Sequence, residues 1–285
     1  MGQLRDRMEA DLKIRGYSSS TRKIYLLYVR QYARHFMRSP AGMGLDEVRE
    51  FLLDMIDRRC LSLSSVKQAR AAICFLYRVT LGRPMEIDRL PVPRRPHRLP
   101  VVLNGTEIRA LLEAVRRPKY RAIFMVMYGA GLRVSEACRL RPEDIDSTRM
   151  VLRVIGKGNR ERLTVLSDRL LDELRSYWRH DRPRGGWLFP NQAGSGYAAR
   201  ETIRRVFQSA VAEAGITKKV TPHTLRHSFA THLIDIGTDV TTVQALLGHK
   251  SIRTTTLYIH ASAERVGRTT SPLDVLGTDT GSILG

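Results

Sequence analysis

The chain has 285 residues, enough for one large domain or two ordinary ones, and its content of 42% hydrophobic and 27% charged residues is typical of a globular protein. No stretch approaches the roughly 20 consecutive apolar residues of a membrane span, and the first residues lack the apolar segment of a secretory signal. We therefore expect a soluble, cytoplasmic protein with no membrane partner. The 48 lysines and arginines outnumber the 28 acidic residues, which leaves a formal net charge of +20. That excess predicts a polyanionic partner, with nucleic acid the leading candidate.

Residues 1–90 are predicted to form a small bundle of helices. Apolar residues recur at helical spacing in three runs, at 24–36, 48–56 and 66–77. Serines 18–20 are candidate N-caps for the first run, and Ser62 or Ser64 for the third. The segment 91–100 follows, with four prolines and three arginines counted from Leu90 to Pro100. Because proline continues neither helix nor sheet, this segment is predicted to be a stiff, basic linker between two domains.

The part of the chain after residue 100 is predicted to be mostly helical with a small sheet. Two short strands, Met150–Ile155 and Arg162–Leu166, are joined by a glycine-rich turn, which is typical of a hairpin. Caps and apolar periodicity predict helices at about 104–116 (capped by Asn104 or Thr106), 120–128, 167–178, 199–214, 222–236, 239–247 and 251–259. The expected fold class is mainly α with a small antiparallel β-sheet.

The three cysteines, Cys60, Cys74 and Cys138, are an odd number and show no CxxC spacing. This pattern argues against both a disulfide framework and a zinc site. All three occur within apolar helical patterns, so we predict that they are small core residues.

Two separated segments carry a basic residue suited to a phosphate. The segment Gly129–Glu136 places Arg133 near a helix start, where a guanidinium can clamp two phosphate oxygens. The alternative is an ion pair between Arg133 and Glu136, which are three residues apart. Lys157 falls at the tip of the predicted hairpin. It is either simply solvated or part of an arm that delivers a proton to a leaving oxygen.

A third segment carries histidines around another arginine. The dipeptide Thr-Pro at 221–222 predicts a helix start, and His223 and Arg226 then share one face near the anion-attracting N-terminus. His223 and His227 have the spacing of a metal pair. No glutamate follows His223, however, and Arg226 would repel a cation, so a metal site is disfavoured. We assign His227 and His232 to structural hydrogen bonds.

The fourth segment contains Gly248, which is predicted to end one helix, and Ser251, which is predicted to cap the next. His249 lies between them, and Tyr258 follows near the end of a threonine-rich helix. A lone tyrosine is usually a packed aromatic residue, so a chemical role for Tyr258 is favoured only because the other three segments occur in the same chain.

Together these segments resemble the tyrosine recombinases, the lambda-integrase and Xer-like family of site-specific DNA recombinases. The resemblance covers residues 100–260 and rests on order and spacing as well as on residue types. The similar stretches are Gly129–Glu136, Gly156–Arg162, Thr221–Leu233, Gly237–His249 and the Tyr258 segment.

The resemblance implies a two-domain DNA clamp. Its parts are a core-binding (SAM-like) helical domain at 1–90, the linker at 91–100, a catalytic domain of the DNA breaking-rejoining type at 101–262, and a tail at 263–285. Recombination needs four strands cut in an ordered way, which implies a tetramer on two DNA sites, and in this family such a tail docks on a neighbouring protomer.

The resemblance also implies the chemistry. Tyr258 is the implied nucleophile, and the implied catalytic set is Arg133, Lys157, His223, Arg226 and His249. The enzyme would cut and rejoin double-stranded DNA through a 3′-phosphotyrosyl link, in DNA integration, excision or transposition. The chain lacks a GxxxxGK[ST] loop, and we expect no ATP, metal or other cofactor. The alternatives are a type IB topoisomerase, or a catalytically silent DNA-binding protein of the same fold.

Overall fold

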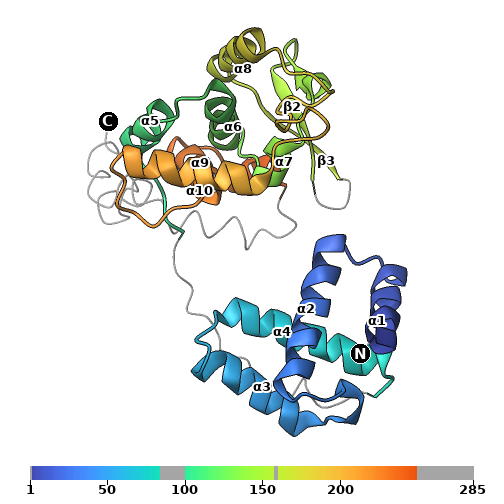
Figure 1. Cartoon of the computed structure of the whole chain (residues 1–285). Coiled ribbons are helices and arrows are strands. Elements are labelled where there is room, and N and C mark those ends of the chain that lie inside the picture. The colour runs from blue at the N-terminus through green and yellow to red at the C-terminus, as the bar shows by residue number, and fades with distance from the viewer. Residues whose placement is uncertain (1, 84–99, 157–159, 249–285) are drawn as a thin grey trace, which may run out of the picture. The chain divides into compact units, whose positions relative to one another are not determined.

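The computed structural model describes residues 2–83, 100–156 and 160–248 (Figure 1). The chain divides into two compact units, residues 1–97 and 98–285. Within the described ranges, no helix is long and apolar enough to cross a membrane. The predicted linker, the helix expected at 251–259 and the tail at 263–285 lie outside the described residues, apart from Pro100.

The N-terminal unit is helical, as its apolar periodicity predicts. Its α-helices are α1 (Gly2–Ile14), α2 (Ser19–His35), α3 (Leu45–Asp57) and α4 (Leu63–Phe75), and α4 continues into a π-helical turn, Leu76–Thr80. Ser18 and Ser62 cap α2 and α4, each accepting a hydrogen bond from a backbone N–H in the first turn. Tyr32 and Tyr77 are fully buried and share a hydrogen bond of 3.1 Å between their hydroxyls.

The prediction of a buried position is wrong for one of the three cysteines. Cys138 is buried and Cys74 is partly buried, but Cys60 is exposed. Cys60 lies beyond the end of α3 and has a φ of +47°. An apolar pattern does not mark where a helix stops, and here the chain leaves α3 before it reaches the cysteine.

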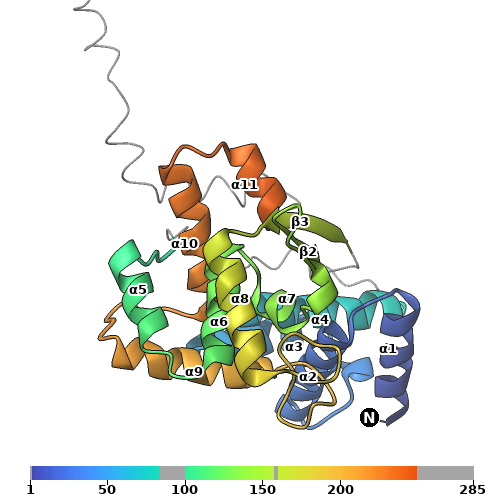
Figure 2. The ribbon, with the colours of Figure 1, turned by 90° about the horizontal axis from the view of Figure 1, so that it is seen from above.

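The second unit is built around a buried helix. Its helices are α5 (Gly105–Glu113), α6 (Pro118–Gly129), α7 (Val134–Cys138), α8 (Asp168–Asp181), α9 (Arg200–Glu213), α10 (Pro222–Asp235) and α11 (Val240–Leu247). Helix α6 buries Ala122, Ile123, Phe124, Val126 and Met127 completely, because α8 and α10 both pack against it (Figure 2). The predicted caps Asn104 and Ser167 open α5 and α8.

The predicted hairpin is confirmed, with a short extra strand beside it. Among the described residues, β1 (Ile145–Asp146), β2 (Val151–Ile155) and β3 (Glu161–Val165) form an antiparallel sheet in the order β1-β2-β3. The tip of the hairpin, residues 157–159, lies outside the described part of the chain. Thr164 of β3 donates a hydrogen bond of 2.8 Å to the carbonyl of Ala130, and α11 lies beside β3 (Figure 2). The sheet therefore borders the loop that precedes Arg133.

Candidate active site

The turn between α6 and α7 positions Arg133. Gly131 adopts a φ of +66°, and a Cβ added there would lie 2.5 Å from the ring of Phe229, so only glycine fits. Arg133 is the N-cap residue of α7. Its backbone N–H donates to Glu136 Oε2 at 2.8 Å, and its Nη1 donates to Oε1 at 2.7 Å. The ion pair named above as an alternative therefore exists. The Arg133 side chain is nevertheless 35% exposed, so solvent reaches it.

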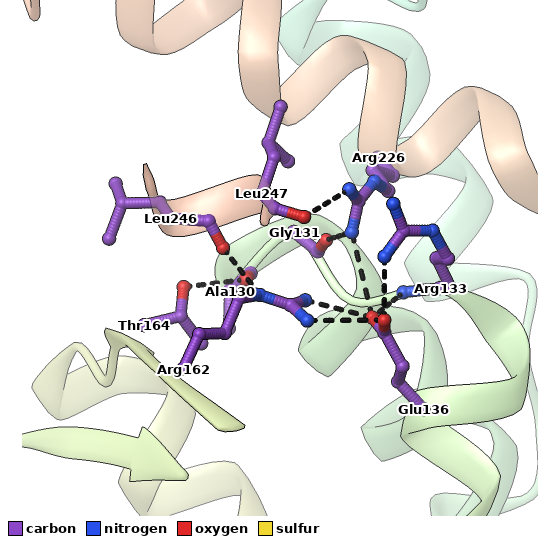
Figure 3. Close-up of polar contacts among 9 residues, drawn as sticks. All are labelled: Ala130, Gly131, Arg133, Glu136, Arg162, Thr164, Arg226, Leu246 and Leu247. Carbon is purple, nitrogen blue, oxygen red and sulfur yellow. Dashed lines mark hydrogen bonds and ion pairs between the residues drawn. The ribbon is translucent and has the colours of Figure 1, made fainter. Parts of the chain in front are cut away.

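Glu136 is the centre of the polar network (Figure 3). Its side chain is 4% exposed and accepts hydrogen bonds from Arg133 and from both Nη atoms of Arg162, at 3.1 and 2.8 Å. Arg226 Nη1 lies 3.6 Å from its Oε2. Burial disfavours the charged form, but the hydrogen bonds and charge of Arg162, followed by those of Arg133, outweigh it and lower the pKa of Glu136 to about 2. The carboxyl group is therefore ionised at neutral pH.

Arg162 is a site residue to which the sequence analysis gave no role. Its side chain is 11% exposed, and besides contacting Glu136 it donates from Nε to the carbonyl of Leu246 at 2.8 Å. Residues two apart in a strand face the same side of a sheet. Arg162 therefore shares the inward face with buried Thr164. This two-residue period was the signal available in the sequence.

Arg226 joins three segments of the site. It lies on α10, which begins at Pro222 as predicted. Its Nη1 donates to the carbonyl of Gly131 and its Nη2 to the carbonyl of Leu247, both at 2.6 Å. The side chain is 4% exposed. Arg226 thus holds together the turn before Arg133, the first turns of α10 and the end of α11.

His223 is an exposed residue in the first turn of α10. Partial removal of its ring from water, followed by the charges of Arg226 and Arg133, lowers its pKa below the usual value, although Glu136 acts in the opposite direction. The imidazole is therefore neutral at pH 7 and able to accept a proton. A hollow of about 590 Å³ lies beside it, lined by Val134, Ala199, Arg200, Glu201, Arg204, Thr221, Pro222 and His223.

Helix α10 carries two further histidines, His227 and His232. His232 Nδ1 is 3.0 Å from the hydroxyl of Tyr128, which confirms a structural hydrogen bond. Burial, followed by the charges of His223 and Arg226, lowers the pKa of His227 to about 4. Among the residues that the structure describes, no group of three or more His, Cys, Asp or Glu side chains could hold a metal ion.

The fold thus brings three of the six predicted site residues together. Arg133, His223 and Arg226 are grouped around Glu136, through direct contact or through their charges. The other three, Lys157, His249 and Tyr258, lie outside the described residues. Strand β3, which follows Lys157, reaches the network through Arg162, and the end of α11 before His249 reaches it through the Leu246 and Leu247 carbonyls.

Comparison with known proteins places this arrangement in a family. Residues 102–265 match the model of the phage integrase family, and residues 4–87 match that of the phage integrase N-terminal SAM-like domain. The chain is 41% identical over 280 residues to y4qK of Sinorhizobium fredii, a protein named as an integrase/recombinase, with 97% of this chain and 90% of that protein covered. It is 38% identical over 203 residues to the tyrosine recombinase XerD of Lacticaseibacillus casei, with 67% and 69% covered.

A solved structure has the same fold. The XerH site-specific recombinase bound to palindromic difH substrate aligns with a TM-score of 0.72 at 24% identity, over 87% of this chain and 77% of that one. The chain therefore belongs to the phage integrase family. It is a site-specific recombinase of the tyrosine class, as the motifs predicted, rather than a topoisomerase or a silent DNA-binding protein.

Proposed function

We propose that this recombinase binds double-stranded DNA and exchanges strands through a 3′-phosphotyrosyl link to Tyr258. The observation that carries the proposal is the convergence of Arg133, Arg162 and Arg226 on the single carboxylate of Glu136. The three guanidinium groups and the one carboxylate of this cluster sum to two positive charges, and all but Arg133 are largely buried. A cationic cluster of this kind is suited to an anion such as a phosphodiester.

The cluster supports a role in stabilising charge. A phosphodiester repels nucleophiles, and its non-bridging oxygens gain charge as the pentacoordinate state forms. A positioned donor is worth about 3–4 kcal/mol of the barrier. Arg133, with a third of its side chain exposed, is assigned to one of these oxygens. Arg226 is assigned to the other, together with His249; because Arg226 is 4% exposed, DNA binding has to uncover it.

Two proton transfers complete the step. The hydroxyl of Tyr258, with an ordinary pKa of about 10, attacks phosphorus and gives its proton to neutral His223. The bond between phosphorus and the 5′ oxygen breaks, and Lys157 protonates the departing oxygen. One phosphoester replaces another, so a 5′ hydroxyl of the second duplex can attack the phosphotyrosyl link in its turn, which forms the new phosphodiester and releases Tyr258 to take back its proton. The proposal accordingly includes no ATP and no metal ion.

The charge distribution supports DNA as the partner. The net charge of +20 favours binding of a polyanion, and the hollow beside His223 carries Arg200 and Arg204 on its α9 wall. We propose that residues 1–90 form the core-binding domain, that 91–100 link it to a catalytic domain at 101–262, and that the tail 263–285 docks on the next protomer of a tetramer in the cytoplasm. Removal of the tail should then reduce strand exchange more than DNA binding, and unchanged exchange would refute the docking.

A covalent-adduct assay tests the chemistry. Footprinting on the DNA that flanks the gene first identifies the site, and a labelled duplex carrying it is then incubated with the protein and denatured. The wild-type protein should leave a protein–DNA adduct. Tyr258→Phe should bind the duplex equally well without forming one, whereas the control Tyr197→Phe, at a partly exposed residue, should form the adduct normally. An adduct formed by Tyr258→Phe would overturn the assignment of the nucleophile.

A further inference from the structure

Arg162 connects parts of the site that are distant in sequence. It is 26 residues from Glu136 and 84 residues from Leu246, and it contacts both. We infer that Arg162 is a positioning residue, which fixes the carboxylate of Glu136 and the end of α11 and so aligns Arg133 with the segment that carries His249 and Tyr258. This inference rests on the proposed function.

The contact between Arg162 and Glu136 has a defined shape. Nη1 and Nη2 of Arg162 hold the two oxygens of Glu136 side by side, while Nε donates to the carbonyl of Leu246 (Figure 3). This use of three nitrogens in one plane is specific to a guanidinium. A lysine ammonium carries the same charge as a point and does not reproduce the fork. The contact therefore defines an orientation in addition to supplying a charge.

Arg162 also binds the C-terminal end of α11. The last carbonyls of a helix have no partner within the helix, and here Arg162 binds that of Leu246 while Arg226 binds that of Leu247. Gly248 follows with a φ of +62°, and a Cβ added there would lie 2.9 Å from Cδ of Arg162. Arg162 is thus packed against the residue immediately before His249. A shift of Arg162 would remove this support from the end of α11.

Arg162 also helps to keep Glu136 ionised. The hydrogen bonds and charge of Arg162 come first among the influences that lower the pKa of Glu136, against the opposing effect of burial. Without Arg162 the burial remains, so the pKa of Glu136 rises and the carboxyl takes up a proton at a higher pH. A protonated Glu136 holds Arg133 less firmly. The loss of Arg162 should therefore harm catalysis more as the pH falls.

The test compares Arg162→Gln and Arg162→Lys with Arg153→Gln. Arg153 lies on the neighbouring strand, is 44% exposed and pairs with Asp144 at 3.0 Å, so its replacement removes the same charge from the same sheet. We expect both Arg162 variants to form the adduct about 10- to 100-fold more slowly in a single turnover, the cost typical of a small misplacement of reacting groups. Their Kd for the duplex should stay within about threefold of wild type, and Arg153→Gln should react normally.

The pH profile separates positioning from general damage. The rate ratio of wild type to Arg162→Gln should grow as the pH is lowered, because the pKa of Glu136 is higher in the variant and its carboxyl group is protonated first. A constant ratio would overturn the inference, as would wild-type rates in Arg162→Gln or full activity in Arg162→Lys. If the wild-type protein forms no adduct, the proposed function fails. If it forms one and the Arg162 variants match it, the inference alone fails.

Gly248→Ala perturbs the same contact from the α11 side. It therefore tests the contact even if the Arg162 variants fold poorly. The added methyl should displace Arg162 and slow adduct formation. The double variant Gly248→Ala with Arg162→Gln should then be slower than wild type by less than the product of the two single effects, because both changes act on one contact. Fully multiplicative effects would show that the two residues act independently and would overturn the inference.

Discussion

Replacing Glu136 by glutamine keeps the shape of the side chain and removes its charge from between three guanidinium groups. The pKa of Glu136 is about 2, against an ordinary 4.5, and each unit corresponds to about 1.4 kcal/mol. The charged carboxylate therefore contributes about 3 kcal/mol to folding, in the range measured when one partner of a buried ion pair is removed. This contribution is complete above the unfolded-state pKa and disappears only as the pH falls through about 2. The full loss is thus expected at pH 7.

Urea unfolding followed by tryptophan fluorescence measures this loss. Trp178 and Trp187 are the two tryptophans of the chain, and both belong to the second unit, so the signal reports on the unit that contains Glu136. A loss of 3 kcal/mol lowers the midpoint by about 1–3 M urea. The control is Glu213→Gln, whose exposed ion pair with Arg116 should contribute less than about 1 kcal/mol. If Glu136→Gln and Glu213→Gln unfold at the same urea concentration, the reasoning about the buried carboxylate is wrong.

Three further outcomes are expected. Gly131→Ala should lower the stability of the second unit by about 1–3 kcal/mol in the same fluorescence assay. The added Cβ would clash with the ring of Phe229, and the positive φ of this residue is strained for alanine. An unchanged urea midpoint would contradict this. Lys157→Ala should cut normal DNA slowly, but its cutting rate should recover on a duplex with sulfur in place of the bridging 5′ oxygen. A thiol with a pKa of about 8.5 can leave as the thiolate, without a proton from a general acid. If the rate does not recover, Lys157 is not the general acid. The logarithm of the DNA-binding constant should fall with the logarithm of salt concentration by about 0.9 per phosphate contacted, so an affinity insensitive to salt would count against phosphate contacts.

The elements that could be predicted from the sequence are those set by local interactions. Asn104 and Ser167 begin helices because their side chains accept hydrogen bonds from N–H groups in the first turn. The hairpin was predicted from two short β-like runs joined by a glycine-rich turn, and β2 of the structure buries Leu152 and Val154. The predicted burial of Cys60 was wrong. The end of a helix depends on what packs around it, and an apolar pattern contains no information on that packing.

The candidate site likewise contains residues that local motifs indicate and residues whose roles depend on packing. Arg133, His223 and Arg226 were predicted because they occur in short motifs with a characteristic order. Glu136 was considered only as a partner of Arg133, whereas it is the buried anion on which Arg162 and Arg226 also converge. Contacts such as that of Arg162 with Leu246, 84 residues apart, depend on how β3 and α11 pack.

The order and spacing of residues along the chain were enough to determine the family, the helical character of both units and half of the polar network. Only the tertiary structure decided that Glu136 is its hub and that Arg162 joins β3 to the end of α11. The physical reason is that the role of a charged side chain depends on burial and on partners distant in sequence. Both of these arise when the elements pack: the two-residue period of β3 indicates which side of the sheet Arg162 faces, but not which residues it contacts there.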